Sequence, residues 1–417
     1  MKNKYIKVAS YEAKKGKIKK VLLLYSGGLD SSVMLHWIQK EYGVPVSTLT
    51  MDIGQQHDNL KAIQEKALKF GASDAIIADI KEEFANDFIA KGIKANACYQ
   101  GDYHLSTPMN RAVLGKIAVK YAKKVGADCI AHGCTGKGND QLRIDGSVLT
   151  HDPEMKILAP VREWAMDRND EIKYAKKHGI PVPTTVDSPY SDDDSMWGIT
   201  WEGGEIENPS QTPVEENFMK TYTFPKNAPD TPEFVEIKFK QGLPVAINNE
   251  KLSLAQLIIK LNKIAGKHGV GTTYLLEDRI IGLKSRGVYE QPAAHTIIEG
   301  HKMLEKYVCT KTLNELKQKM DVDWGYLCYG GMWYDPSMKA INSFNDEVNK
   351  KVSGVVKIKL FKGNLTVVSI KSPNALAYSS FNNKAGYNYN VNCSTGFIEV
   401  YTLQTKIANN ITSYNSF

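Results

Sequence analysis

Short apolar stretches alternate with amphipathic ones along the first third of the chain. Four runs of mainly apolar residues, each of the length of a β-strand, lie at 21–24, 45–51, 74–80 and 128–132. Between them, apolar residues recur at helical spacing, which predicts helices over 33–38, 60–70, 82–94 and 111–124. Because strands that alternate with helices form a parallel sheet covered on both faces, we expect a doubly wound α/β domain.

The pattern changes after residue 181. Pro181-Val182-Pro183 marks a candidate domain boundary, and residues 187–232 are rich in proline and predict loops. Further on, alternating apolar residues around short glycine turns predict two antiparallel hairpins, at 234–247 and 355–370. Helical periodicity returns at 252–268, 295–308 and 310–320. We therefore expect a second domain of the α+β class, and segment bounds of 1–17, 18–181, 182–378 and 379–417.

Composition and charge indicate a soluble protein. No apolar run approaches the roughly 20 residues of a membrane span, and the start of the chain lacks the apolar stretch of a secretory signal. The net charge is +7, and the first 20 residues, with eight lysines and one glutamate, account for all of it. Such a basic terminus is either a nucleic-acid arm or a solvated end. The balanced remainder argues against a broad nucleic-acid surface, so we expect no nucleic-acid or membrane partner.

Six cysteines are spread along the chain, at positions 98, 129, 134, 309, 328 and 393. None forms a C-x-x-C pair or lies in a Cys/His cluster with metal-ligand spacing. In a chain of 417 residues this pattern is typical of reduced thiols, and it favours a cytoplasmic location.

The turn at 26–32, Ser-Gly-Gly-Leu-Asp-Ser-Ser, follows the first strand and begins a helix. Such a turn presents backbone N–H groups and the positive end of a helix dipole, both of which suit a phosphate. An ordinary strand-to-helix turn is the alternative, because Gly-Gly pairs are common in turns. The turn is not a Walker A loop, since no Gly-Lys-Ser/Thr follows. A second glycine-rich loop, 133–140, ends the fourth strand, so the two loops are expected to meet at one edge of the sheet.

The Ser-Gly-Gly-x-Asp form of the first turn resembles the pyrophosphate-loop ATPases. Within that superfamily, longer motifs resemble argininosuccinate synthase, in the family's order. They are Asp-Ile-Gly-Gln at 52–55, Thr-Gly-Lys-Gly-Asn-Asp-Gln at 135–141, Tyr-Ala-Lys-Lys-His-Gly-Ile-Pro at 174–181, Pro-Tyr-Ser at 189–191, Trp-Glu-Gly-Gly at 201–204, Ala-Gly-Lys-His-Gly-Val-Gly at 265–271, Glu-Asp-Arg at 277–279 and Lys-Ser-Arg-Gly-Val-Tyr-Glu at 284–290.

The resemblance implies a ligase that joins L-citrulline and L-aspartate at the cost of ATP, with Mg²⁺ on the phosphates. It implies an adenine nucleotide alpha-hydrolase-like domain at 18–181 that binds ATP, and a synthetase domain at 182–378. It also implies a homotetramer held by the C-terminal segment 379–417, although this segment is short here. Two alternatives remain open: a tRNA-modifying member of the superfamily, and a nucleotide-binding paralogue without activity.

The resemblance also implies site residues. ATP is expected to contact Leu24, Tyr25, Ser26, Gly27, Gly28, Leu29, Asp30, Ser31, Ser32, Met51, Gly133, Thr135 and Asp193. The two amino-acid substrates are expected to contact Tyr103, Thr107, Thr135, Asn139, Asp140, Arg143, Ser191, Thr200, Glu202, Glu277 and Tyr289. Catalysis is expected to be mostly positional, with Asp140 and Arg143 as the best candidates and no protein metal ligand assigned.

Three positions depart from the family's pattern. Ser31 replaces a threonine and keeps the hydroxyl, whereas Cys134 replaces a smaller residue inside the aspartate-side loop and is a place where oxidation could inhibit. Thr107-Pro108 stands where many relatives place a hydroxyl on citrulline, which leaves that contact open.

Overall fold

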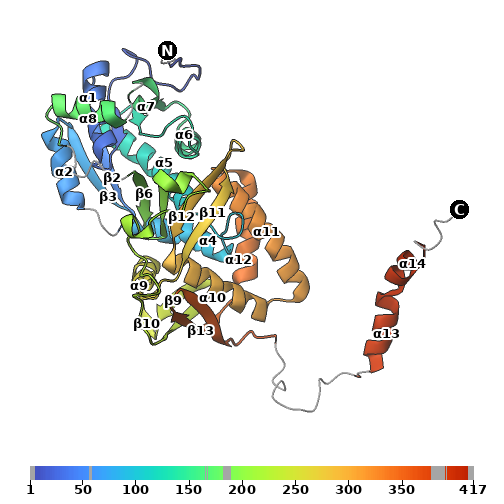
Figure 1. The fold of residues 1–417 in the computed structure, drawn as a ribbon. Helices are drawn as coiled ribbons and strands as arrows, with labels where there is room; N and C mark the ends of the chain where they lie inside the picture. Colours follow the sequence, from blue (N-terminus) through green and yellow to red (C-terminus); the bar gives the residue numbers. More distant parts are fainter. Residues whose placement is uncertain are drawn as a thin grey trace. The chain divides into compact units, whose positions relative to one another are not determined.

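A computed structural model describes residues 5–55, 59–164, 166, 168–181, 189–376, 390 and 392–411. The chain divides into two compact units, Met1–Asn374 and Ala375–Phe417 (Figure 1). The expected domain boundary lies between residues 181 and 182. Residues 182–188 lie outside the described part of the chain.

The first sheet is parallel, and its strands lie in the order β3-β2-β1-β4-β5. Four strands confirm the sequence prediction: β1 (Val21–Leu24), β2 (Val46–Asp52), β3 (Asp74–Asp79) and β4 (Cys129–Ala131). The fifth, β5 (Lys156–Leu158), was not predicted, because three residues are too few to show a period. Adjacent residues of β1 serve opposite faces, since Leu22 and Leu23 belong to different apolar cores.

Helices cover both faces of this sheet, as expected for a doubly wound domain (Figure 1). They are α1 (Leu29–Tyr42), α2 (Leu60–Lys69), α5 (Ser106–Val125), α6 (Asp140–His151), α7 (Pro160–Glu163) and α8 (Arg168–Lys177). The helix predicted over 82–94 is α3 (Lys81–Glu83) and α4 (Ala90–Lys94), joined by a π-helical stretch, Phe84–Ile89.

Two loops at the edge of the first sheet lead directly into helices. α5 begins at Ser106, five residues before the predicted helix at 111, and Leu105 before it adopts a left-handed backbone with φ of 61°. The glycine-rich loop that begins at residue 133 ends at Asn139, after which α6 begins. The polar residues of both loops therefore stand on helix N-termini, which hold them more rigidly than a loop does.

The second sheet is antiparallel, in the order β10-β9-β8-β13-β14. It contains both predicted hairpins, β8 (Glu233–Lys240) with β9 (Leu243–Ile247) and β13 (Gly354–Phe361) with β14 (Asn364–Lys371), together with the short β10 (Glu250–Lys251). One face packs on α9 (Leu254–Lys267) and α10 (Pro292–Val308), which were predicted. Two further helices are α11 (Lys311–Tyr329), which ends nine residues later than expected, and α12 (Pro336–Asn349).

A third sheet, in the order β11-β12-β7-β6, corrects the prediction of loops at 187–232. Its strands are β6 (Tyr190–Ser195), β7 (Gly198–Gly203), β11 (Thr272–Asp278) and β12 (Lys284–Glu290). β6 contains three consecutive aspartates, so no apolar alternation marks it, and it forms because it pairs with β7 at the sheet edge. This sheet carries six of the expected substrate or nucleotide residues, Ser191, Asp193, Thr200, Glu202, Glu277 and Tyr289.

The carboxylate of Glu290, at the end of β12, is 1% exposed and organises the segment after β7. It accepts hydrogen bonds from the Trp201 indole at 2.7 Å and from the backbone N–H groups of Lys220, Thr221 and Tyr222 at 2.6–2.9 Å. Replacing it leaves these buried donors without a partner, so we expect Glu290→Ala to lower the free energy of unfolding by about 3–5 kcal/mol.

Denaturant unfolding measures this loss, and Glu236→Ala is the matched control. Glu236 stands on β8 with 42% of its side chain exposed and forms one ion pair, with Lys357 at 3.4 Å. We expect the control to change stability by less than about 0.5 kcal/mol. A Glu290→Ala protein as stable as the control would contradict the assigned role.

The second unit contains two described helices, α13 (Asn392–Tyr401) and α14 (Leu403–Ile411). Large apolar side chains of these helices are exposed within the unit, among them Phe397, Val400 and Tyr401. Among the described helices of both units, none combines the length and the apolar character that crossing a membrane requires.

Candidate active site

Two neighbouring cavities lie beyond the carboxyl ends of the first sheet. The nucleotide-side cavity, beside the glycine turn, has a volume of about 470 Å³, and the substrate-side cavity has a volume of about 540 Å³. Their shared wall consists of the residues that line both cavities, Asp30, Arg111, Gly133, Cys134, Asp192 and Asp193. Both glycine-rich loops reach this wall, as the sequence predicted from their position after strands.

The glycine turn is shaped by its neighbours. Gly27 has φ of 78°, and a Cβ there would lie 2.8 Å from the Ile63 side chain, so only glycine fits. Lys66 Nζ donates to the Gly27 carbonyl at 2.7 Å. The hydroxyl oxygens of Ser26 and Ser31 lie 3.2 Å apart at the start of α1. Backbone N–H groups, two hydroxyls and a helix N-terminus thus converge on the nucleotide-side cavity, an arrangement that suits a phosphate chain.

The structure places most of the expected nucleotide residues around this cavity. Those that line it are Leu24, Tyr25, Ser26, Gly28, Asp30, Ser31, Met51, Gly133 and Asp193. Gly27, Leu29, Ser32 and Thr135 do not. Leu29 packs with Val33 and Ala175 in an apolar cluster, and the Ser32 hydroxyl donates to the Gly28 carbonyl at 2.7 Å. Both therefore shape the turn from behind.

The substrate-side cavity collects most of the expected substrate residues from α5, α6 and the third sheet. Those that line it are Tyr103, Thr107, Thr135, Asn139, Asp140, Arg143, Ser191, Thr200 and Glu202. Glu277 and Tyr289 do not line it. Tyr289 stacks on Tyr103 with ring centroids 4.1 Å apart and donates to Glu277 Oε2 at 2.9 Å, so the pair supports the wall from behind.

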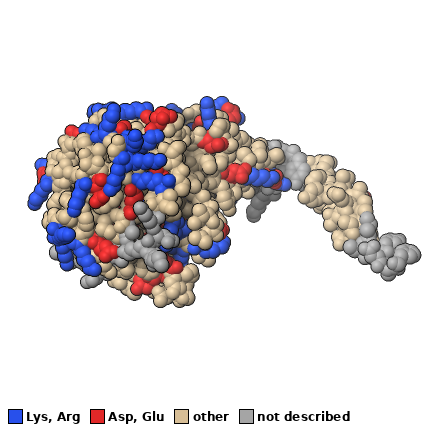
Figure 2. Space-filling model, turned by 90° about the horizontal axis from the view of Figure 1, so that it is seen from above, with Lys and Arg blue, Asp and Glu red and all other residues tan. Residues whose placement is uncertain are grey.

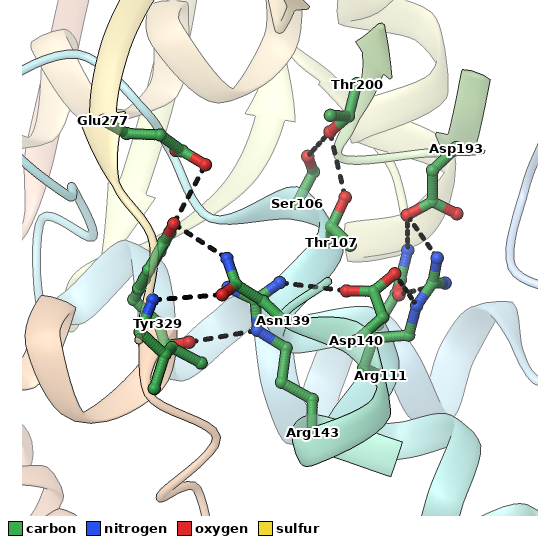
Figure 3. A network of polar contacts seen from close by, with 12 residues as sticks. Ser106, Thr107, Arg111, Asn139, Asp140, Arg143, Asp193, Thr200, Glu277 and Tyr329 are labelled. Carbon is green, nitrogen blue, oxygen red and sulfur yellow. Dashed lines mark hydrogen bonds and ion pairs between the residues drawn. The ribbon is translucent and has the colours of Figure 1, made fainter. Parts of the chain in front are cut away.

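The Asp140 carboxylate is held between two arginines (Figure 3). Arg111 Nε donates to Oδ2 at 2.9 Å, and Arg143 donates to Oδ1 at 3.0 Å. Burial disfavours the charged form, but the two guanidinium groups outweigh this effect and lower the pKa of the Asp140 carboxyl. Asp140 is therefore ionised at neutral pH and can accept a further hydrogen bond from an amine.

Arg143 is 4% exposed, and only part of its guanidinium forms hydrogen bonds within the described residues. Its Nε donates to the Tyr329 carbonyl at 3.0 Å, and its guanidinium carbon lies 4.7 Å from the centre of the Tyr329 ring. Among the described residues, the second terminal nitrogen has no hydrogen-bond partner. A buried cationic donor at the wall of a cavity suits a substrate carboxylate.

Two glutamates add negative charge near the same cavity: Glu277 is buried, whereas Glu202 is exposed. Partial loss of hydration raises the pKa of Glu202, and the neighbouring carboxylate of Asp140 adds to the rise. Burial also raises the pKa of Glu277, although hydrogen bonds from Tyr289 and Tyr329, both at 2.9 Å, oppose it. Glu202 lines the cavity directly, so an ammonium group that enters the cavity can pair with it and stabilise its ionised form.

The positions that depart from the family's pattern are also placed. The Thr107 hydroxyl lies 2.9 Å from that of Thr200, and both residues line the cavity. Cys134 lies on the shared wall, and its backbone N–H donates to His132 Nδ1 at 3.1 Å. His132 is buried, and its Nε2 lies 2.7 Å from Asp145 Oδ1, so it supports the loop from behind.

Sequence reasoning missed several residues of the site. Arg111, Asp192, Arg279 and Tyr329 line the substrate-side cavity. Arg111 stands four residues after Thr107 on α5, so helical spacing alone could have found it. Tyr329, at the end of α11, carries no local signal. Its hydroxyl accepts from Asn139 Nδ2 and donates to Glu277, both at 2.9 Å, across a large sequence separation.

Fold and site together are typical of an α/β nucleotide-binding enzyme, in which a glycine turn suited to phosphate and a cavity lined by charged residues share one wall. Comparison with known families agrees with this class. The model of the Arginosuccinate synthase N-terminal HUP domain matches residues 20–181, and that of the C-terminal domain matches residues 190–408. The chain belongs to the argininosuccinate synthase family, whose members are ligases.

Relatives support this assignment over nearly the whole length. An argininosuccinate synthase of Pyrococcus furiosus is 48% identical, over 94% of this chain and 95% of the relative. One of Symbiobacterium thermophilum is 43% identical, over 93% of this chain and 97% of the relative.

A solved complex of a 4-thiouridine synthetase with RNA and ATP is 22% identical over 39% of this chain and 41% of the other, with a TM-score of 0.30.

Proposed function

We propose that the protein ligates L-citrulline and L-aspartate to argininosuccinate, converting ATP to AMP and pyrophosphate. One observation carries the proposal: a phosphate-binding turn and a pocket with paired carboxylates and arginines meet at a shared wall, in a chain that belongs to this family throughout. A tRNA-modifying activity and a non-catalytic role are not favoured, since the charged residues of the pocket are all present.

The reaction has two steps. The ureido oxygen of citrulline bonds to the α-phosphorus of ATP, while the bond from that phosphorus to the bridging oxygen breaks and its electron pair leaves with pyrophosphate. The ureido carbon of the resulting citrullyl-AMP then bonds to the amine of aspartate, and AMP departs with the electron pair of the broken carbon–oxygen bond. The amine loses a proton to solvent. Both steps depend chiefly on positioning and on stabilising charge.

The site residues divide between the two cavities. We assign the phosphates of ATP to the turn at 26–32 and the adenine to Met51. We assign aspartate to Thr135, Asn139 and Asp140, where Asp140 accepts from the amine. Citrulline contacts Arg143 through its carboxylate and Glu202 through its ammonium, with Asn139 also in reach and the remaining contacts from Tyr103, Thr107, Ser191 and Thr200. Glu277 and Tyr289 hold this pocket from the layer behind.

Mg²⁺ fits the site as a partner of the phosphates. The described residues contain no group of three or more His, Cys, Asp or Glu side chains that could cage a metal. Asp30 is an exposed carboxylate on the shared wall, and one carboxylate plus substrate phosphates is a common Mg²⁺ environment. When bound, the ion would neutralise the phosphates, with Asp30 as its protein ligand.

Several further assignments belong to this proposal. We place the domain boundary near residue 181, consistent with the change from parallel to antiparallel sheets.

We propose a cytoplasmic homotetramer in which the exposed apolar side chains of α13 and α14 form contacts between subunits. We expect no nucleic-acid partner, since basic and acidic residues balance outside the first 20 residues, and acidic side chains lie among the basic ones on the face drawn in Figure 2.

A coupled assay tests the proposed function. We expect pyrophosphate release from ATP to require citrulline, and argininosuccinate to form only when aspartate is also present. Pyrophosphate and argininosuccinate are measured separately, with each substrate omitted in turn. The proposal fails if pyrophosphate release is indifferent to citrulline, or if a tRNA substrate stimulates it instead.

A further inference from the structure

Arg111 lies on the wall that the two cavities share. Among the cationic side chains of the described residues, it alone lines both: Arg143 and Arg279 line the substrate-side cavity, and Lys220 and His132 line the nucleotide-side cavity. The shared wall is where the α-phosphate of a nucleotide in one cavity would meet a substrate in the other. Arg111 is therefore the cationic side chain, among those of the described residues, that reaches this junction from both cavities.

Three contacts hold the guanidinium of Arg111 in place (Figure 3). Nε donates to Asp140 at 2.9 Å, one terminal nitrogen donates to Asn110 Oδ1 at 2.8 Å, and the other lies 3.0 Å from Asp193. These partners come from α6, α5 and β6, so the group is fixed from three elements. Burial opposes its charge, but Asp140 and Asp193 outweigh this effect and raise the pKa of the guanidinium.

The contacts leave donors free for a ligand. A guanidinium carries five N–H groups. Nε and one terminal nitrogen each donate one hydrogen bond, and the other terminal nitrogen forms an ion pair with Asp193. The remaining N–H of each terminal nitrogen is available to an anion at the wall. A lysine could not be held by three partners and still offer two donors in a fixed plane.

We propose that Arg111 is a catalytic residue of the first half-reaction, in which its two free N–H groups contact a non-bridging oxygen of the α-phosphate. This inference rests on the proposed function. As the ureido oxygen bonds to phosphorus and the electron pair moves to pyrophosphate, negative charge gathers on the phosphoryl oxygens. A cation already oriented by Asp140, Asp193 and Asn110 stabilises that charge without reorganising. Arg111 transfers no proton and forms no covalent bond.

Variants of Arg111 test this role in the full-length enzyme. The rate of citrulline-dependent pyrophosphate formation is measured in a single turnover without aspartate. We expect Arg111→Met to be slower by about 10²–10³-fold, the loss typical of one charge-stabilising donor group. The Kd values of ATP and citrulline should change less than tenfold. Lys116→Met, on the same helix but outside both cavities, is the control and should match the wild type.

A second measurement separates direct contact from a merely structural role. The wild type should discriminate between the two diastereomers of ATP that carry sulfur on the α-phosphate, because one of them places sulfur against Arg111. Arg111→Met, and Arg111→Lys if the methionine variant does not fold, should lose that discrimination. Guanidinium ion should partly restore the rate of Arg111→Ala.

The outcomes distinguish this inference from the proposed function. A wild type with no citrulline-dependent pyrophosphate formation overturns the proposed function, and with it the role of Arg111. A wild type that forms pyrophosphate, together with an Arg111→Met enzyme within fivefold of its rate, overturns the role of Arg111 alone. A slow variant that keeps full discrimination between the diastereomers also overturns it, because Arg111 would then act only through its neighbours.

Discussion

Asp140→Ala should reduce argininosuccinate formation by roughly 10²–10³-fold, within the range of about 2–5 kcal/mol lost when one partner of a hydrogen-bonded charge pair in a binding site is removed. The carboxylate accepts from Arg111 and Arg143 and is proposed to accept from the amine of aspartate as well. Citrulline adenylation should lose much less. Arg111 keeps its contacts to Asp193 and Asn110 when Asp140 is absent, so the charge at the shared wall stays in place.

The two half-reactions are compared in rapid-quench experiments, with pyrophosphate reporting adenylation and argininosuccinate reporting the second step. Asp140→Asn, which keeps the size of the side chain, should show the same order of losses. Asp152→Ala, at the other end of α6, pairs with exposed Lys123 and should leave both steps unchanged. Equal losses in both half-reactions would count against an aspartate-side role for Asp140.

Arg143→Met should raise the KM for citrulline by roughly 10²–10⁴-fold, again from the loss of one member of a buried charge pair. The terminal nitrogen without a protein partner is the donor that a substrate carboxylate would take, and the Tyr329 ring and carbonyl aim it. Arg143→Lys keeps the charge but loses the planar fork, so it should recover only part of the affinity.

Steady-state kinetics with citrulline varied at saturating ATP and aspartate measure this effect. Arg168→Met removes an exposed arginine at the start of α8 and serves as the control. A KM for citrulline that stays within threefold of the wild type in Arg143→Met, with the KM for aspartate raised instead, would show that Arg143 binds the other substrate.

Local patterns were sufficient for the elements that pack through their own periodicity. The first four parallel strands were predictable as short apolar runs between helical stretches. Both hairpins, 234–247 and 355–370, were predictable because their apolar residues alternate and glycine marks the turns. The third sheet was not. β6 is nearly all polar and is a strand only because β7 pairs with it, and β7 in turn pairs with β12, which lies more than 80 residues further along the chain.

The sequence also predicted which residues belong to the site, but not which of them line the cavity and which lie behind it. Motifs placed Asp140, Arg143 and Glu202 at the pocket, and the structure lines the substrate-side cavity with them. No motif could tell that Glu277 and Tyr289 stand one layer behind, because that depends on how the rings of Tyr103 and Tyr289 stack.

By itself, the sequence determined the parallel nucleotide-binding sheet, the glycine turn at its edge, the family and most of the charged residues of the pocket. The sheet and the turn follow from helix and strand periods and turn residues within short stretches, whereas the family and the pocket residues follow from motifs that resemble the family. Only the tertiary structure decided which charges face one another. Arg111 meets Asp193 across 82 positions, and Arg143 meets Tyr329 across 186. Contacts between distant segments depend on how whole elements pack, and packing leaves no local pattern to read.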